Sequence, residues 1–207
     1  MQLDACPVRC TCGSLRGVAR DLGPSQVNRV MCNCKFCATF ADVLGRSEDM
    51  LDERRGCDIF QMSPRKLELS EGLEHLACLR LTKTGALRFY ASCCNTPIAN
   101  TIANSKMPFM GLSPLMIPWE ELGQAREEVL GPVVARVNGR FEPGEAKALR
   151  ARKLDLVRML ARLGPKMIGW RLRGDQAHSP VADANGRPKV EPQRVERDAR
   201  LQPTRAG

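Results

Sequence analysis

Cysteine is the residue type in this sequence with the clearest chemical potential. Ten cysteines occur in 207 residues, and seven fall in three short clusters: "CTC" at Cys10 and Cys12, "CNCKFC" at Cys32, Cys34 and Cys37, and "CC" at Cys93 and Cys94. In a reducing compartment, clustered thiols are typical of metal ligands or redox groups rather than structural disulfides. Zinc is the expected metal, because thiolates bind it in a tetrahedron. Three clusters predict two metal sites.

The middle cluster supplies three ligands from one short stretch. We expect Cys32 and Cys34 at the end of a strand and Cys37 in the first turn of the next helix, where the helix N-terminus favours thiolate. Three protein ligands leave the fourth position to water or a substrate thiol, which is typical of catalytic zinc. A redox pair at Cys34 and Cys37 is an alternative that the absence of a βαβ pattern disfavours. An iron–sulfur cluster needs four ligands, one more than this cluster supplies.

The two outer clusters lie about 80 residues apart. A metal held between them would connect the first hairpin to a late strand and contribute to folding, by about 10 kcal/mol for structural zinc in small peptides. Other candidate ligands are weaker. Cys57 and Cys78 lie in apolar strand segments and are expected to be small buried side chains. The two histidines, His75 and His178, are expected at the surface.

Length and composition indicate one core with appendages. Hydrophobic residues make up 43% of the chain and aromatic residues only 4%, so metal binding is expected to add to stability. No apolar stretch has the length of a signal peptide or of a membrane span. The sequence therefore predicts a soluble, cytoplasmic protein.

The net charge of +9 is concentrated in one segment. Residues 145–173 carry nine basic and two acidic side chains, whereas residues 1–144 carry 17 basic and 16 acidic ones. A folded module that binds nucleic acid is normally basic itself, so this distribution argues against nucleic acid as the partner. The basic side chains of residues 145–173 are expected on the solvated face of a helix.

The strand pattern predicts a mainly β fold with a C-terminal helical extension. Within residues 1–104, seven segments separated by turn residues are predicted as strands: "SLRGVAR", "VNRVMC", "CDIFQM", "KLELS", "LACLRL", "ALRFYAS" and "PIANT". One helix is predicted over residues 35–44, ended by Gly45. These elements form the first of three zones.

The remaining two zones are a helical extension over residues 105–173, packed on the first zone, and a disordered tail over residues 174–207. The extension contains a strong helical pattern that we expect to stop at Gly164–Pro165. Its apolar stripe is expected to dock on the protein and comprises Leu149, Leu156, Val157, Leu160 and Leu163. The tail is rich in proline and polar residues and lacks apolar periodicity.

Four motifs occur in order between about residues 8 and 104: "CTCGSLRG", "CNCKFC", "GCDIFQMSPRKLEL" and "GALRFYASCCNTPIANT". Together they resemble the family of glutathione-dependent formaldehyde-activating enzymes and centromere protein V. The resemblance implies a β-tent-like fold of small antiparallel sheets around two zinc ions. It also implies a structural zinc on Cys10, Cys12 and a late cysteine pair, and a second zinc, where glutathione binds, on Cys32, Cys34 and Cys37.

The late motif departs from the family pattern Cys-x-x-Cys-Gly-Thr-Pro. Ala91 stands where the first cysteine belongs, and Asn95 stands at the glycine. Cys93 can substitute only if the backbone turns, because adjacent residues on a strand point to opposite faces. Cys94 is therefore the safer ligand. Cys6 or water is an alternative fourth ligand, so one or two zinc ions are expected.

The family's reaction adds glutathione to formaldehyde to give S-hydroxymethylglutathione. The resemblance thus implies a carbon–sulfur lyase-type enzyme, or a binder of thiol adducts, whose partner is a small thiol such as glutathione. Because glutathione carries carboxylates, nearby cationic residues would bind it; the candidates by sequence proximity are Arg16, Lys35, Arg54 and Arg55. The alternative is a non-catalytic, zinc-stabilised module that binds a partner through its basic helix.

Overall fold

The structure is a computed structural model that describes residues 1–102, 107–138, 153–183 and 185–195. It is mainly β with helices toward the C-terminus, which confirms the predicted fold class. Its strands are β1 (Leu3–Arg9), β2 (Arg16–Leu22), β3 (Asn28–Cys32), β4 (Cys57–Met62), β5 (Leu67–Glu71), β6 (Leu76–Arg80), β7 (Leu87–Ala91), β8 (Thr96–Thr101), β9 (Met110–Leu112), β10 (Ala135–Val137) and β11 (Gln193–Arg194).

Five helices occur among the described residues: α1 (Lys35–Leu44), α2 (Ser47–Met50), α3 (Trp119–Leu122), α4 (Arg126–Leu130) and α5 (Lys153–Leu172). Short 3₁₀ turns lie at Pro64–Lys66, Leu73–His75, Pro114–Met116 and Asp175–His178. No described helix combines the length and the apolar character needed to span a membrane.

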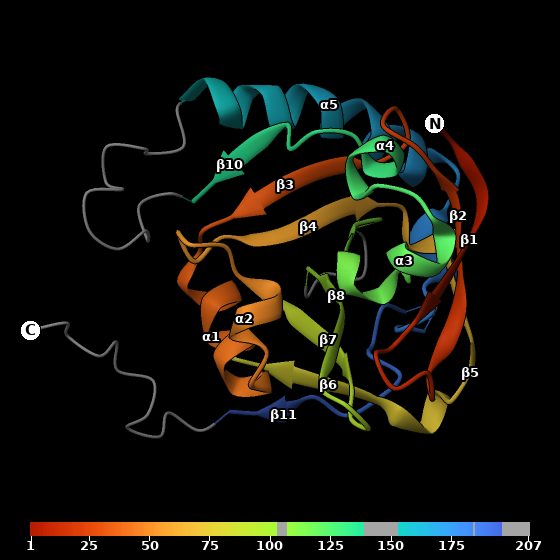
Figure 1. Cartoon of the computed structure of the whole chain (residues 1–207), viewed down its shortest axis with the longest axis vertical. Helices are drawn as coiled ribbons and strands as arrows, with labels where there is room; N and C mark the ends of the chain where they lie inside the picture. The colour runs from red at the N-terminus through yellow and green to blue at the C-terminus, as the bar shows by residue number, and fades with distance from the viewer. Residues whose placement is uncertain (103–106, 139–152, 184, 196–207) are drawn as a thin grey trace, which may run out of the picture.

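The strands form two sheets. One has three strands in the order β1–β2–β5, and the other has eight in the order β10–β3–β4–β9–β8–β7–β6–β11 (Figure 1). Neighbouring strands are antiparallel, except that β10 runs parallel to β3 and β11 parallel to β6. The seven predicted strand segments correspond to β2 through β8. Residues 105–173 contribute strands β9 and β10 to the larger sheet, in addition to the expected helices.

The eight-stranded sheet separates two buried clusters. The larger cluster lies between the two sheets and includes Leu15 and Phe89. The smaller cluster lies on the opposite face, where Phe40 and Leu44 of α1 pack against Val30 of β3. Because successive strand residues point to opposite faces, β4, β6 and β7 contribute side chains to both clusters. One face of this sheet therefore packs against the smaller sheet, and the other face packs against α1.

Helix α1 has the predicted bounds, and both of its ends are capped. At its end Gly45 has φ +65°, a left-handed conformation in which its N–H donates to the carbonyl of Asp42. At its start the sulfur of Cys34 accepts a hydrogen bond from the N–H of Cys37. The helix is thus fixed at the point where the middle cysteine cluster begins.

Helix α5 continues through Gly164–Pro165 to Leu172, so the predicted stop is wrong. Pro165 has no N–H to donate to the carbonyl of Ala161, four residues earlier. Both residues are exposed, so water can donate to that carbonyl instead. The helix runs along β10 and β3 (Figure 1). Within residues 155–172 of this helix, the buried side chains are Leu163 and Trp170.

The apolar stripe of α5 is only partly docked. Leu163 is buried as expected, but three stripe residues that we expected to be docked are exposed: Leu156, Val157 and Leu160. Leu149 lies outside the described residues. The continuation of the helix beyond Pro165 brings Trp170 into the protein, and this second anchor sets which face of the helix is buried.

The C-terminal segment is packed where we expected disorder, over residues 174–183 and 185–195. Val181 is fully buried in the larger cluster, and Asp175 accepts a hydrogen bond from the Ser63 hydroxyl at 2.8 Å. Strand β11 pairs with β6. A few well-placed contacts order this segment although it lacks apolar periodicity. The rest of the predicted tail, residues 196–207, lies outside the described residues.

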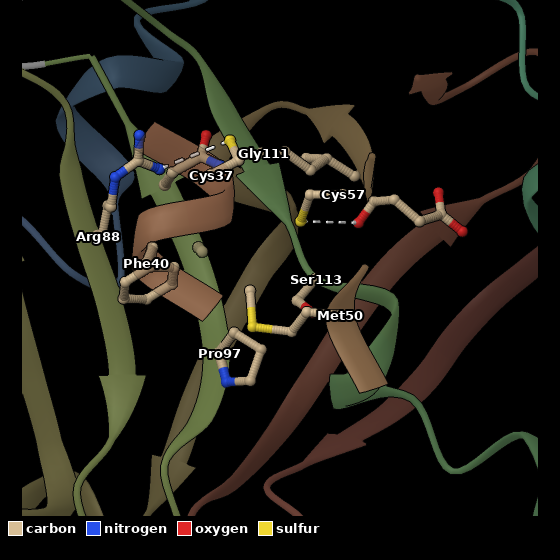
Figure 2. Close-up of a pocket in the computed structure, with 12 residues that line it drawn as sticks. Cys37, Phe40, Met50, Cys57, Arg88, Pro97, Gly111 and Ser113 are labelled. Carbon is tan, nitrogen blue, oxygen red and sulfur yellow. Dashed lines mark hydrogen bonds between the residues drawn. The ribbon is translucent and has the colours of Figure 1, made fainter. Parts of the chain in front are cut away.

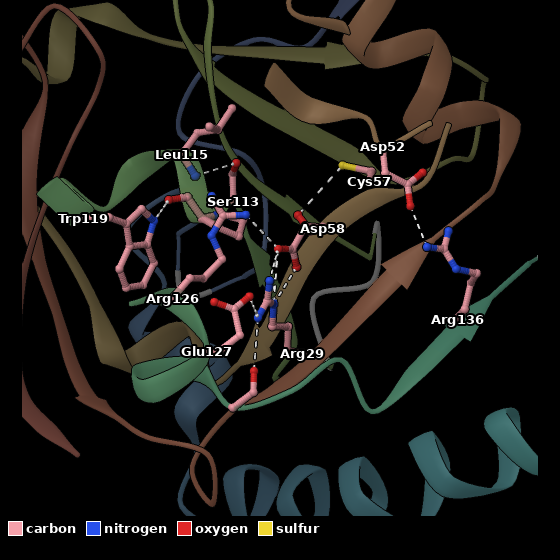
Figure 3. Close-up of polar contacts among 12 residues, drawn as sticks. Arg29, Asp52, Cys57, Asp58, Ser113, Leu115, Trp119, Arg126, Glu127 and Arg136 are labelled. Carbon is pink, nitrogen blue, oxygen red and sulfur yellow. Dashed lines mark hydrogen bonds and ion pairs between the residues drawn. The ribbon is translucent and has the colours of Figure 1, made fainter. Parts of the chain in front are cut away.

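An ionic cluster connects β3, β4 and α4 (Figure 3). The guanidinium of Arg29 is buried and contacts Asp58 at 2.7 Å and Glu127 at 3.0 Å. Arg126 contacts the same Asp58 carboxylate at 3.0 Å. Desolvation works against the charge of Arg29, but Asp58 and then Glu127 outweigh it and raise the pKa of Arg29. The buried charge is therefore paired from two sides.

We predict that Asp58→Asn lowers the free energy of unfolding by about 3 kcal/mol, because it leaves Arg29 buried with its main carboxylate removed. The matched control is Glu121→Gln, which removes the exposed partner of Arg9 and should cost less than about 1 kcal/mol. Urea unfolding measures both. Equal losses in the two variants would contradict the role assigned to this cluster.

Candidate metal centres

The first sulfur group consists of Cys10, Cys12, Cys93 and Cys94, whose sulfur atoms all lie within 4.8 Å of one another. The Sγ–Sγ distances are 3.5 Å for Cys10–Cys12, 3.7 Å for Cys10–Cys93, 3.3 Å for Cys12–Cys93 and 3.8 Å for Cys93–Cys94. The edge of a zinc–thiolate tetrahedron is about 3.8 Å, whereas a disulfide bond is about 2.05 Å. The spacing therefore fits four ligands of one tetrahedral ion.

The first half of this group lies in the turn between β1 and β2. Gly13 adopts φ +77° and donates its N–H to the carbonyl of Cys10. The N–H of Leu15 donates to the Cys10 sulfur at 3.3 Å. Gly72 lets the neighbouring chain approach this turn, since a Cβ there would lie 2.0 Å from the carbonyl oxygen of Ser14. These contacts fix the turn around Cys10 and Cys12.

The second half lies in the turn between β7 and β8. The N–H of Cys94 donates to the carbonyl of Ala91, and Asn95 adopts φ +56°. Asparagine tolerates this left-handed conformation better than most residues, so it can replace the glycine of the family pattern. The turn meets the condition set by the sequence, because it directs the adjacent Cys93 and Cys94 toward the same point.

Two threonine hydroxyls join the turns of the first group. Thr11 Oγ1 and Thr96 Oγ1 are 2.9 Å apart, and Thr96 Oγ1 is 3.0 Å from the Cys94 sulfur. Burial opposes ionisation of Cys94, but the hydroxyls of Thr11 and Thr96 outweigh it and lower its pKa to about 5. Cys6 lies outside the group; its sulfur is 3.6 Å from the carbonyl of Pro7, and burial raises its pKa to about 11.

The second sulfur group consists of Cys32, Cys34 and Cys37, whose sulfur atoms also lie within 4.8 Å of one another. Cys32 is the last residue of β3, Cys34 caps α1, and Cys37 lies in the first turn of that helix. The Cys37 N–H donates to the Cys34 sulfur at 3.3 Å. Cys32 and Cys37 lie in the elements that the sequence predicts, whereas Cys34 lies two residues beyond the end of β3, at the start of α1.

The thiols of the second group differ in the direction of their pKa shifts. The pKa of Cys34 is lowered because the Cys32 and Cys37 thiols donate to its sulfur, with a smaller contribution from the charge of Arg88. The pKa of Cys32 is raised by the same contact with Cys34 and then by Cys37 and burial. One sulfur is thus already disposed to carry negative charge, which is the state that a metal ligand requires.

Asn33 holds the loop between the second group's first two cysteines. Its N–H donates to the carbonyl of Val137 at 2.9 Å, and its side chain donates to the carbonyl of Arg54 at 2.8 Å. Its side-chain oxygen accepts from Arg136 at 3.0 Å, and Arg136 in turn pairs with Asp52 (Figure 3). Asn33 is buried, so these bonds fix the direction of the neighbouring cysteines.

A cavity of about 390 Å³ adjoins the second group. Cys32 and Cys37 form part of its wall, and Arg88 reaches it from β7. The remaining lining residues are Val30, Ile59, Gln61, Ala86, Asn100, Phe109, Val137, Asn138, Leu156 and Met159. No cysteine of the first group lines this cavity. The second group therefore adjoins a space in which a small molecule could bind.

A smaller pocket is also lined by Cys37 (Figure 2). Arg88 points toward the Cys37 sulfur there, and its guanidinium lies 5.7 Å from the ring of Phe40. Cys57 lines the same pocket. The Cys32 thiol lowers the pKa of Cys37, but the thiols of Cys34 and Cys57, together with burial, outweigh it and raise that pKa. Cys57 is thus a close neighbour of the group without belonging to it.

The cationic residues proposed from sequence proximity line neither cavity. Arg16 contacts the turn of the first group, and Arg55 pairs with Asp42 at 2.7 Å. Lys35 and Arg54 are exposed. Proximity along the chain therefore does not predict proximity to the cavity.

Sequence reasoning missed Arg88 and Asn138, although both contact the second group. Arg88 Nη1 is 3.9 Å from the Cys37 sulfur, and Asn138 Nδ2 donates to the Cys32 sulfur at 3.4 Å. One signal for Arg88 was present, because a charged residue inside the apolar strand "ALRFYAS" needs a special partner. Asn138 carries no comparable signal in the sequence.

The fold and the two sulfur groups define a mainly β protein with two cysteine-rich candidate metal centres. The chain belongs to the family of unknown function DUF6151, which matches residues 3–189. No curated protein matches the chain. A Rhodobacter sphaeroides protein, determined by crystallography as a structural-genomics target, matches at 16% identity with a TM-score of 0.39, covering 57% of this chain and 96% of that chain. A likeness this distant carries no inference about function.

We predict that the chain, purified under reducing conditions, binds up to two zinc ions, one for each sulfur group. The double variant Cys12→Ser/Cys93→Ser should lower the zinc content by about one ion per chain, because it removes two of four ligands. Cys78→Ala is the matched control, since it removes a buried thiol outside both groups. Elemental analysis of the purified variants checks this. An unchanged zinc content in the double variant would exclude the first site.

We also predict that Asn33→Ala weakens metal binding at the second group by about tenfold, because it frees the loop that orients two ligands. The matched control is Asn95→Gly in the other cysteine turn, where glycine tolerates the same backbone conformation and affinity should not change. Competition with a chromophoric chelator measures both affinities. Equal affinity in Asn33→Ala and the native protein would contradict the role of this side chain.

Proposed function

We propose that this protein holds two zinc ions with different roles. The ion on Cys10, Cys12, Cys93 and Cys94 is structural, because four protein ligands complete its tetrahedron. The ion on Cys32, Cys34 and Cys37 has three protein ligands and one position for an exchangeable ligand. We propose that this ligand is a small thiol, and that the protein works in the reducing environment of the cytoplasm.

One observation carries this proposal: the group with three sulfur atoms is the group that lines a cavity. Four sulfur atoms around the other group leave no tetrahedral position free. A zinc site with an open position and a space beside it is the usual arrangement for binding a reacting molecule. When bound there, zinc would supply a positive charge that favours the thiolate form of a thiol ligand.

The residues around the second group support a thiolate-rich site. Asn138 donates a hydrogen bond to Cys32, and the N–H at the start of α1 donates to Cys34. Arg88 adds a positive charge beside Cys37. Each of these contacts stabilises negative charge on sulfur. Buried and half-buried neighbours also limit the access of water to the sulfur atoms.

The finer proposal concerns the reaction. The motifs that resemble the glutathione-dependent formaldehyde-activating enzymes include both sulfur groups, so carbon–sulfur lyase chemistry on glutathione and formaldehyde is the reaction class we propose to test first. The DUF6151 family carries no assigned function. Thiol binding is therefore the primary proposal, and turnover of a thiol–aldehyde adduct is a separate measurement.

A second candidate function is a zinc-stabilised module that binds a partner through α5. The observation that favours it is the exposure of Leu156, Val157 and Leu160 on a helix that also carries arginines. In this alternative both ions are structural and no thiol reaches either one. The same experiment distinguishes the two functions.

We predict that a small thiol such as glutathione changes the absorption spectrum of the cobalt-substituted protein, because an added thiolate ligand shifts the visible d–d bands of cobalt and strengthens the sulfur-to-metal charge transfer in the near ultraviolet. Cys34→Ser should remain folded, since the first group and the core are intact, but should lose this response. Cys93→Ser, which alters the other group, should keep it. A response of full size in Cys34→Ser would contradict the assignment.

Cys57→Ala is a further control for the open position. If the position is open, this variant keeps both the cobalt spectrum and the thiol response. If Cys57 instead moves in as a fourth ligand, the native protein shows four-thiolate absorption that weakens in Cys57→Ala. A native protein with four thiolates at both centres and no response to any thiol would favour the module.

A further inference from the structure

Arg88 is a buried cation without a carboxylate partner. Its relative exposure is 6%, close to the 5% of Arg29, which has Asp58 and Glu127 as partners. Among the residues that the structure describes, no aspartate or glutamate pairs with Arg88. Its one side-chain hydrogen bond to a described residue is with the Cys37 sulfur at 3.9 Å, and it involves Nη1 alone. Burying a guanidinium with so few partners is costly unless another group completes its bonding.

The unpaired nitrogens of Arg88 open onto the cavities beside the second group. A guanidinium carries five N–H donors in a planar fork. Arg88 lines both the cavity of about 390 Å³ and the smaller pocket behind Cys37. None of its nitrogens is among the buried, partnerless polar atoms of the described chain, so those without a hydrogen bond keep some exposed surface. The ring of Phe40 holds the guanidinium in position from one side.

The cavity is otherwise suited to a small organic molecule rather than to a bare inorganic anion. Val30, Ile59 and Phe109 provide apolar walls, and Asn100 provides an amide. Aspartate and glutamate are absent from the lining residues of this cavity. A ligand here would meet sulfur atoms and a guanidinium at one end and apolar side chains along its length. A planar carboxylate matches the guanidinium fork with two parallel hydrogen bonds.

We propose that Arg88 binds the carboxylate of the thiol ligand, and that the ligand of the second group is a short mercapto acid. This inference rests on the proposed thiol-binding function. Arg88 lies against a sulfur of the group itself, so the carboxylate must lie within a few bonds of the thiol. Recognition then requires both ends of one small molecule: the sulfur at the metal centre and the carboxylate at Arg88.

The experiment compares 3-mercaptopropionate with its uncharged amide, 3-mercaptopropionamide, as ligands of the cobalt-substituted full chain. Spectral titration gives a dissociation constant for each ligand in the native protein, in Arg88→Met and in Arg80→Met. Arg80 lies on the adjacent strand β6 and contacts the Lys83 carbonyl, so its replacement is the matched control. For each protein we take the ratio of the two dissociation constants, acid to amide. The ratio in Arg88→Met is the reference, so that the different acidities of the two thiol groups cancel.

We expect the preference for the acid over the amide to be about tenfold larger in the native protein and in Arg80→Met than in Arg88→Met. A factor of this size is usual for a charge-assisted contact. Binding of the amide should be similar in all three proteins. Equal weakening of acid and amide in Arg88→Met would overturn the inference and assign Arg88 to balancing the charge of the cysteine sulfurs. Should Arg88→Met fail to fold, equal binding of acid and amide by the native protein would overturn it as well.

The outcomes separate this inference from the proposed function. If both thiols bind but without an effect of Arg88, the proposed function stands and the inference falls. If no thiol changes the spectrum of the native protein, the proposed function falls and the inference falls with it.

Discussion

Crowding of sulfur atoms is the constraint on which the organisation of this protein depends. Four thiols in one group and three in another are held at separations where they cannot all ionise without a compensating cation. The close spacing of the sulfur atoms is set by specific turns of the backbone rather than by apolar packing. Gly13 and Asn95 adopt left-handed conformations in the two turns of the first group, and Asn33 anchors the loop of the second. The hydrogen bonds of these turns hold the cysteine sulfur atoms in position.

The eight-stranded sheet gives the two groups different surroundings. The first group joins the turn between β1 and β2 of the smaller sheet to the turn between β7 and β8 of the larger one. The second lies on the face covered by α1, where β3 and β7 contribute Cys32 and Arg88 from opposite sides of the sheet's centre. The ionic cluster around Arg29 fixes β3 against β4 and α4, so the strand that carries Cys32 is held firmly. The two sulfur groups therefore lie in different surroundings: one joins two hairpin turns, and the other lies beside a cavity.

Much of the local structure could be predicted, because it depends on short-range patterns. The strands from β2 to β8, helix α1 and the gathering of Cys32, Cys34 and Cys37 all follow from neighbouring residues. The features missed depend on contacts between distant segments. Strand β11 has only two residues, and its existence depends on β6. The position of Arg88 beside Cys37 depends on the register of β7 across the sheet. The continuation of α5 past Pro165 depends on the burial of Trp170, which no local signal reports.

The separation of the first group's two turns has a consequence for how the chain is made. Cys12 and Cys93 are 81 positions apart, whereas Cys34 and Cys37 are three apart. A ribosome therefore releases every thiol of the second group well before it releases the second half of the first. During synthesis of the 81 residues that follow Cys12, the nascent chain exposes Cys10 and Cys12 as an incomplete pair, open to oxidation or to capture of the wrong ion, until the β7–β8 turn emerges and encloses them.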